Sequence, residues 1–151
     1  MNEQPSDLLG FRIREEFERA RRYSLSFSLV LLGIDELHGL DDEPLRQEVH
    51  QTIRRELRMP DLVLPYGPDQ FAILLPETGQ SGARQSVVRV RERLTSLPFK
   101  GDPRLEASRF SAGIVTYPHP AAFQADDLFG LVEAALLRGR AQALERIGVA
   151  V

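Results

Sequence analysis

The sequence predicts an α/β (α+β) fold in which helices flank a central mixed β-sheet. Three observations predict it. Segments with helical and strand-like periodicity alternate along the chain, one nearly continuous apolar run has the length of a strand, and a composition of 42% hydrophobic and 27% charged residues is typical of a globular protein. A chain of 151 residues has the size of one ordinary domain, so we expect a single domain over 1–151 with its core in 7–146.

The first three elements are expected to be a helix, a strand and a helix. A charged helix should run from Asp7, as its N-cap, to Arg22, because apolar side chains recur at every fourth position. The apolar run Phe27–Ile34 is typical of a strand that is covered on both faces. A second helix is expected over about 43–57, and Pro60 ends it because the proline ring disfavours helical geometry in the preceding residue.

The middle of the chain predicts a β-hairpin. Two short apolar runs, over 62–66 and 71–75, are separated by four residues that begin with Gly67 and Pro68. Glycine and proline together are typical of a tight turn, so the two runs are expected to pair as neighbouring strands.

The rest of the chain predicts a helix, a strand and a helix, over about 81–97, within 104–116 and over about 126–145. Each helix carries one apolar stripe at helical spacing. The resulting order, α-β-α-β-β-α-β-α, requires a mixed sheet with helices packed over it.

Charge and composition exclude several classes of function. The net charge of −3 gives no electrostatic reason to expect binding to DNA or to an anionic membrane. The chain has no cysteines, and its three histidines show no metal-ligand spacing, so we expect neither a metal nor a cofactor. The polar N-terminus lacks the apolar segment of a secretory signal, and no apolar run approaches the ~20 residues that span a bilayer, so a cytoplasmic location is expected.

Three segments resemble the GGDEF domain family of diguanylate cyclases. YGPDQFAILLPET, over 66–78, resembles the family's signature hairpin, which reads Gly-Gly-Asp/Glu-Glu-Phe before an apolar strand. ERARRYSLSFSLVLLGID, over 18–35, resembles its entry helix and first strand, and FSAGIVTYP, over 110–118, resembles its Ser-x-Gly strand. The resemblance covers about 7–146 and implies a GGDEF/nucleotidyl-cyclase-like fold in bacterial signal transduction.

The resemblance also implies a reaction that this sequence departs from. The family joins two GTP molecules across a dimer with two metal ions held by carboxylates, since Mg²⁺ prefers hard oxygen ligands. Gly33 stands where the family has its first metal-binding Asp, and Pro68, which has no N–H to donate, stands where it has its second Gly. The positions interpreted as remnants of a degenerate active site are Gly33, Asp35, Gly67, Pro68, Asp69 and Gln70. We therefore expect no catalytic residues and a catalytically inactive domain that is not an enzyme.

A second sequence motif of the family is present in this chain. Arg58 and Asp61 form the Arg-x-x-Asp of the inhibitory product site that many of these cyclases carry, and Asp61 lies six residues before Gly67, as in the family. Arg89 matches the arginine that the next helix adds to this site. Arginine can fork onto guanine or phosphate, and aspartate can accept hydrogen bonds from a guanine edge. We therefore predict a non-catalytic receptor and regulatory module that binds cyclic di-GMP through Arg58, Asp61 and Arg89.

Other interpretations stay open. Arg58 near a helix C-terminus is favourable to the helix dipole without any ligand, Asp61 could simply pair with Arg58, and Asp69 suits a turn. The chain could instead be a nucleotide-free scaffold derived from a diguanylate cyclase, which binds a protein partner or a second copy of itself. A GTP-binding regulator without turnover is a third and poorer candidate, because Gly33 and Pro68 count against it.

Overall fold

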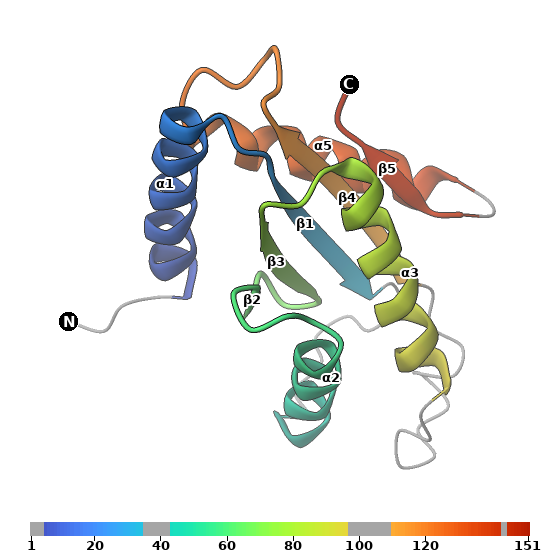
Figure 1. The fold of residues 1–151 in the computed structure, drawn as a ribbon. Coiled ribbons are helices and arrows are strands. Elements are labelled where there is room, and N and C mark those ends of the chain that lie inside the picture. Colours follow the sequence, from blue (N-terminus) through green and yellow to red (C-terminus); the bar gives the residue numbers. More distant parts are fainter. Residues whose placement is uncertain (1–4, 35–42, 97–109, 143–144) are drawn as a thin grey trace.

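The computed structural model describes residues 5–34, 43–96, 110–142 and 145–151. Within these ranges it holds four helices and one five-stranded sheet (Figure 1). In chain order the elements are α1 (Pro5–Tyr23), β1 (Phe27–Ile34), α2 (Glu43–Arg55), β2 (Leu62–Pro65), β3 (Gln70–Pro76), α3 (Gln80–Ser96), β4 (Phe110–Tyr117), α5 (Asp127–Ala141) and β5 (Ile147–Val149).

The sheet is mixed, as the sequence predicts. Its strand order is β2-β3-β1-β4-β5, and β1 in the centre pairs antiparallel with both β3 and β4. The edge strand β5 pairs parallel with β4. In this register Gly33 lies opposite Gln70 on one side and Ser111 on the other, so the C-terminal end of β1 adjoins the start of the β3 hairpin strand.

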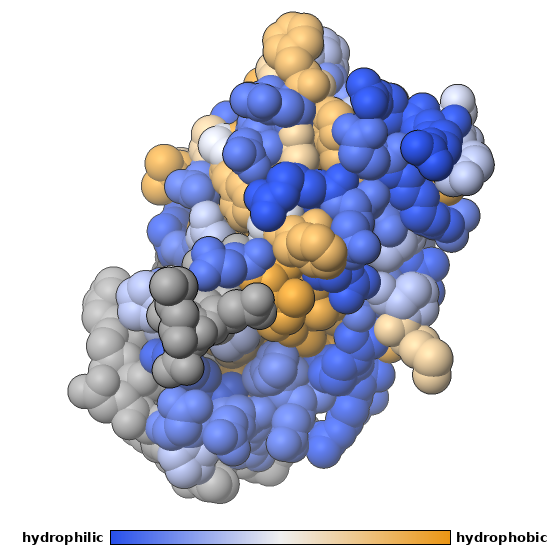
Figure 2. Space-filling view, turned by 90° about the vertical axis from the view of Figure 1, so that its left-hand side faces the viewer, coloured by the Kyte–Doolittle hydropathy of each residue, from blue (hydrophilic) through white to orange (hydrophobic). Residues whose placement is uncertain are grey.

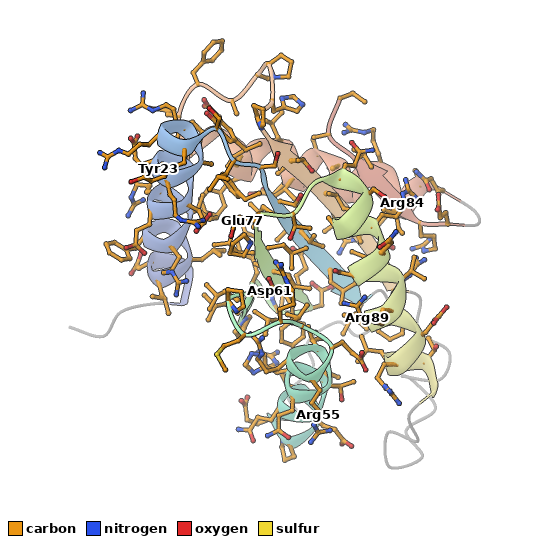
Figure 3. The ribbon with its side chains drawn as sticks, viewed as in Figure 1. Tyr23, Arg55, Asp61, Glu77, Arg84 and Arg89 are labelled. Carbon is orange, nitrogen blue, oxygen red and sulfur yellow. The ribbon has the colours of Figure 1, made fainter. Side chains whose placement is uncertain are left out.

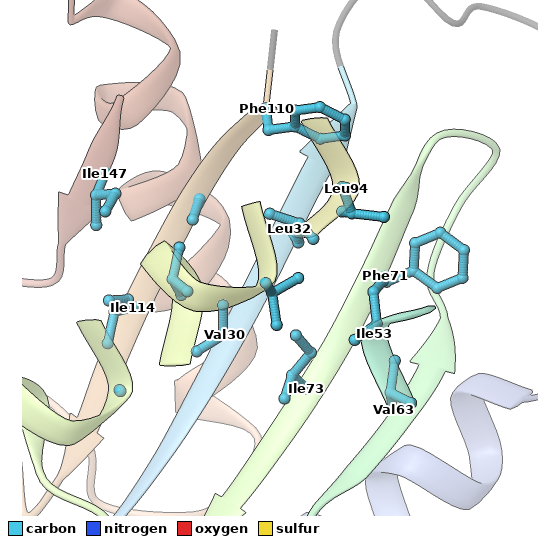
Figure 4. Packing of buried hydrophobic residues seen from close by; sticks show 14 of the residues in the cluster. Val30, Leu32, Ile53, Val63, Phe71, Ile73, Leu94, Phe110, Ile114 and Ile147 are labelled. Atoms are coloured by element: carbon cyan, nitrogen blue, oxygen red, sulfur yellow. The ribbon is translucent and has the colours of Figure 1, made fainter. Parts of the chain in front are cut away.

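Two hydrophobic layers cover the two faces of the sheet. Every residue of β1 is buried, which confirms the expectation of a strand covered on both sides. Alternate residues point to opposite faces, so Val30 and Leu32 belong to the layer with α2 and α3, part of which Figure 4 shows from close by, whereas Leu29 and Leu31 belong to the layer with α1 and α5. Figure 1 shows α3 and α5 on opposite sides of the sheet.

Several boundaries differ from the sequence-based expectation. The first helix begins at Pro5, so Asp7 lies in its first turn and is not the N-cap. Proline is tolerated there, because the first turn has no intrahelical acceptor for its missing N–H. The second helix ends at Arg55, short of the expected 57. The strand expected within 104–116 is described only from Phe110, and its earlier part lies outside the described residues.

The helix α5 approaches the sheet very closely at two glycines, Gly113 and Gly139. A Cβ atom on Gly113 would lie 2.6 Å from the carbonyl oxygen of Val132 and would also collide with the amide nitrogen of Leu136. A Cβ on Gly139 would lie 2.5 Å from the carbonyl oxygen of Ala112. The helix therefore rests on β4 backbone to backbone, and no side chain separates them at these points.

The α1 side of the molecule is mostly hydrophilic, with a smaller apolar area (Figure 2). Leu8 and Phe11 are exposed large hydrophobic residues of α1. Of the helices that the structure describes, none is both long enough and apolar enough to span a lipid bilayer.

Candidate functional site

The turn that joins α2 to β2 is closed by an ion pair between Arg58 and Asp61. The side chain of Asp61 is only 3% exposed, so its carboxylate is buried. Its Oδ1 accepts a hydrogen bond from Arg58 Nη2 at 2.8 Å, and its Oδ2 accepts from Arg58 Nε at 3.2 Å and from the backbone N–H of Arg58 at 2.8 Å. Such a bidentate contact fixes the orientation of the guanidinium plane.

The same guanidinium is tied to the end of β3. Arg58 Nη2 also donates to the carbonyl oxygen of Pro76 at 2.7 Å and to Thr78 Oγ1 at 2.9 Å. The hydrogen bond that Arg58 donates to Asp61 raises the pKa of Arg58 above its usual value, against a smaller opposing effect of desolvation. The Arg58 side chain nevertheless stays 52% exposed, so a permanently charged and fixed guanidinium faces the solvent.

The backbone of this turn is held from α2. Arg54 donates one guanidinium nitrogen to the carbonyl oxygen of Asp61 and the other to that of Arg58. The amide of Asp61 donates to the carbonyl oxygen of Arg58 at 3.1 Å. Arg54 therefore braces both ends of the turn, a role that the sequence pattern alone did not indicate.

Arg89 reaches the end of α2 from α3, and Figure 3 labels Arg89 on α3 and Asp61 on the segment that leads into β2. Its Nη2 donates to the backbone oxygen of Glu56 at 3.0 Å, and its Nε lies 3.7 Å from Glu56 Oε2. Arg93, one turn further along α3, donates from Nε to Glu56 Oε1 at 2.8 Å. These residues and Glu92 line an open recess of about 400 Å³.

The structure thus brings the three predicted ligand residues to one end of α2 in two groups. Arg58 and Asp61 bind each other directly, whereas Arg89 binds Glu56, two residues before Arg58. The apolar stripe of α3 correctly predicts that Arg89 points away from the core. Its partner Glu56, which is only 16% exposed, was missed, because the pairing crosses from one helix to the end of another. The signal in the sequence would have been the i, i+4 spacing of Arg89 and Arg93.

The hairpin turn lies at the opposite end of β2. The N–H of Tyr66 donates to the carbonyl oxygen of Gln70 at 2.8 Å and closes the turn, and Gly67 adopts a positive φ of 70° that favours glycine. The N–H of Ile34 donates to the carbonyl oxygen of Asp69 at 3.0 Å, which joins the turn to the end of β1. The carbonyl oxygen of Pro68 accepts from Arg46 of α2 at 3.0 Å. Asp35 lies outside the described residues.

A guanidinium occupies the space beside Gly33. A Cβ atom on Gly33 would lie 2.9 Å from Nη2 of Arg140, a residue of α5. Of the hairpin residues that the structure describes, only Asp69 offers a carboxylate, and no described cluster of three His, Cys, Asp or Glu side chains is suited to hold a metal ion. The positive charge of Arg140 therefore lies beside the strand position at which the resemblance implies a magnesium ligand.

Tyr66 connects this hairpin to α5. Its hydroxyl donates to Glu133 Oε1 at 2.8 Å, and its ring stacks on Phe129 with 6.4 Å between the ring centroids. Burial, and then the hydrogen bond and negative charge of Glu133, raise the pKa of Tyr66 to about 12. Tyr66, Glu133 and Arg140 contribute to a recess of about 240 Å³ between the hairpin and α5.

Replacing Glu133 by glutamine is expected to lower the pKa of Tyr66 from about 12, but not to its ordinary value of 10.0, because burial remains as the largest cause. Because the folded-state pKa is raised, this environment stabilises the fold below pH 10 and its contribution disappears as the pH rises from 10.0 through about 12. Ultraviolet absorbance of tyrosinate, titrated in the wild type, Glu133→Gln and Tyr66→Phe, measures the shift. An unchanged Tyr66 transition in Glu133→Gln would contradict the assignment.

Comparison with known proteins identifies similar domains. The family model described as "Diguanylate cyclase, GGDEF domain" matches residues 8–146. The diguanylate cyclase DgcP of Pseudomonas aeruginosa is 28% identical over 151 residues, which take in 94% of this chain and 22% of that protein. The chain therefore spans about a fifth of the length of this curated relative.

Solved structures share the fold. The active GGEEF domain of a diguanylate cyclase from Vibrio cholerae matches with a TM-score of 0.81 at 19% identity, over 95% of this chain and 94% of that chain. The GGDEF domain of DgcB from Caulobacter crescentus, in complex with c-di-GMP, matches with a TM-score of 0.79 at 20% identity, over 94% and 88% of the two chains. These likenesses confirm the predicted fold class.

The comparisons contradict the prediction that the chain is not an enzyme, and that prediction is wrong. The curated relative is named as a diguanylate cyclase, and the V. cholerae domain is described as active. The prediction treated the replacements at Gly33 and Pro68 as a loss of catalysis. A replaced residue is a difference in sequence, however, and carries no measurement of a rate.

Proposed function

Because the chain belongs to the GGDEF domain family of diguanylate cyclases, we propose that it binds cyclic di-GMP as a regulatory ligand through Arg58, Asp61 and Arg89. The observation that carries the proposal is the state of Arg58. Its guanidinium is fixed by Asp61, Pro76 and Thr78, yet half of the side chain is open to solvent. A cation that is already oriented loses little conformational freedom on binding, which favours affinity.

The chemistry of the ligand suits these residues. Cyclic di-GMP has two guanine bases and two phosphodiester groups, and a guanidinium can bond to guanine O6 and N7 or to phosphate oxygens. The open face of Arg58 can also stack on a base. Arg89 supplies a second half-exposed guanidinium from the neighbouring helix. The DgcB domain, a neighbour in fold, is itself solved in complex with c-di-GMP.

Asp61 contributes to the proposed site through Arg58. Both of its carboxylate oxygens already accept hydrogen bonds from Arg58, and the side chain is almost fully buried. In this conformation Asp61 therefore positions Arg58, and direct contact with a guanine edge requires the turn to open. We assign Asp61 to the site on that basis.

Isothermal titration calorimetry with cyclic di-GMP tests the proposal on the whole chain. The wild type is expected to bind in the micromolar range or tighter, and Arg89→Ala should weaken binding about tenfold or more, since one charge-assisted contact is worth roughly 1.5–3 kcal/mol. Arg84→Ala is the matched control, because Arg84 lies on the same helix but pairs with Glu145. Absence of heat at high ligand concentration would reject the proposal and favour the interaction or dimerisation scaffold.

The reaction after which the relatives are named is tested on the same preparation. Incubation with GTP and Mg²⁺, followed by chromatography of the nucleotides, reveals whether cyclic di-GMP is formed. Product formation would make the Arg58–Asp61 turn a product site within an enzyme. The calorimetric test of the ligand site does not depend on the outcome, because it uses added cyclic di-GMP.

A further inference from the structure

Arg89 and Arg93 share one anionic partner. The two arginines are four residues apart on α3 and therefore lie on the same face of the helix. Glu56 follows the end of α2 and places its carboxylate against both, with Oε1 bonded to Arg93 Nε at 2.8 Å and Oε2 at 3.7 Å from Arg89 Nε. A carboxylate and a phosphate present the same kind of oxygen acceptor to a guanidinium.

Among the residues that the structure describes, the charges that line this recess balance one another. Two arginines and two glutamates line it, namely Arg89, Arg93, Glu56 and Glu92. A dianionic ligand gains little from a neutral surface, so the carboxylate between the arginines opposes its binding. In this site the Glu56 carboxylate therefore already occupies the position between the two arginines that a phosphate of cyclic di-GMP would take.

We propose that a phosphate group of the ligand replaces the Glu56 carboxylate between Arg89 and Arg93. Arg93 is then a fourth ligand-binding residue, and Glu56 is an internal competitor that sets the affinity. This inference rests on the proposed function, since it concerns the same ligand and the Arg89 side of the same site.

The local bonding allows the exchange without rebuilding the site. Glu56 lies just beyond the last residue of α2, and a change of its side-chain rotamer leaves the backbone in place. Arg89 keeps its 3.0 Å hydrogen bond to the backbone oxygen of Glu56 when the carboxylate leaves, and stays in place. Arg93 loses its 2.8 Å bond to the carboxylate and gains a phosphate oxygen instead.

Two variants with opposite expected effects test the proposal by calorimetry with cyclic di-GMP. Glu56→Gln should tighten binding about fivefold or more, because it removes the competing charge and keeps the shape of the side chain. Arg93→Gln should weaken binding about fivefold or more, because a phosphate contact is lost. Glu92→Gln is the matched control, since it removes the same charge from the same recess but from a residue that forms no bond to Arg89 or Arg93 in the described structure. Circular dichroism melts confirm that each variant is folded.

The outcomes separate this inference from the proposed function. If Arg89→Ala weakens binding while Arg93→Gln matches the wild type, or if Glu56→Gln gains no more than Glu92→Gln, the competitor model is wrong and the ligand site stands. If neither the wild type nor Glu56→Gln binds, both proposals fail. If only Glu56→Gln binds, the competition is supported and the wild-type receptor function is not.

Discussion

Replacing Gly113 by alanine is expected to lower the free energy of unfolding by about 3 kcal/mol. The added methyl group would lie 2.6 Å from the carbonyl oxygen of Val132 and would collide with the amide of Leu136. Both atoms belong to the backbone of α5, which cannot rotate away as a side chain can. The helix must therefore lift from β4, and the buried contacts of Leu136 loosen with it. Urea unfolding followed by circular dichroism measures the loss.

Gly33→Ala is the matched control for this prediction. Gly33 is also a buried strand glycine, but its added methyl group would approach only the flexible ends of side chains, with Arg140 Nη2 the nearest atom at 2.9 Å. Its stability is expected to stay within about 1 kcal/mol of the wild type, because the guanidinium can shift. Equal losses of stability in Gly113→Ala and Gly33→Ala would show that Gly113 is not needed for the close approach of helix and sheet.

Replacing Arg58 by alanine is expected to lower the free energy of unfolding by about 2 kcal/mol. The change leaves the carboxylate of Asp61 almost fully buried without the guanidinium that accompanies it. It also removes the bonds that tie the turn to Pro76 and Thr78 at the end of β3. This loss in stability is smaller than that expected for a fully buried ion pair, because half of the Arg58 side chain is in contact with water.

A double-mutant cycle isolates the pair. Arg58→Ala together with Asp61→Ala should lose less stability than the sum of the single changes, by about 1 kcal/mol, because the double variant strands no buried charge. Arg55→Ala, an exposed arginine at the end of the same helix, should change stability by less than about 0.5 kcal/mol. Strict additivity of Arg58→Ala and Asp61→Ala would contradict a coupled pair.

The same bonds decide which variants report cleanly on ligand binding. Because Arg58 and Asp61 build the turn, a loss of binding in Arg58→Ala mixes a missing contact with a loosened backbone. Arg89 and Arg93 are half-exposed residues on the surface of α3, so their replacement removes contacts to the ligand with little effect on the fold. Variants of Arg89 and Arg93 on α3 therefore report most directly on ligand binding.

Local patterns in the sequence predicted most of the fold. The apolar run of β1 and the helical stripes of α3 and α5 are strong signals, because each element buries a full face or stripe. The short edge strand β5 was not predicted. Three residues of strand are too few for a periodic signal, and β5 forms through its parallel pairing with β4, a contact distant in sequence.

The candidate site was predictable in its residue types and less so in its connections. The resemblance to the family assigned Arg58, Asp61 and Arg89 to one site, and the structure describes all three near the C-terminal end of α2. The bonds that govern them come from Glu56, Arg54 and Thr78, and they depend on how α2, α3 and the end of β3 meet. No local sequence pattern predicts these contacts, because the two residues of each contact lie in different parts of the chain.

The glycine contact between α5 and the sheet also sets the position of a charged residue, Arg140. Gly139 rests against the backbone of β4, and Arg140 is the next residue along the helix. Since no side chain separates the helix from the strand at this point, the contact sets the backbone position of Arg140, and its guanidinium reaches the space beside Gly33 at the end of β1. The missing methyl group at Gly139 thus determines where the next residue of the same helix extends its positive charge, so enlarging Gly139 would displace that charge from the end of β1 as well as weaken the fold.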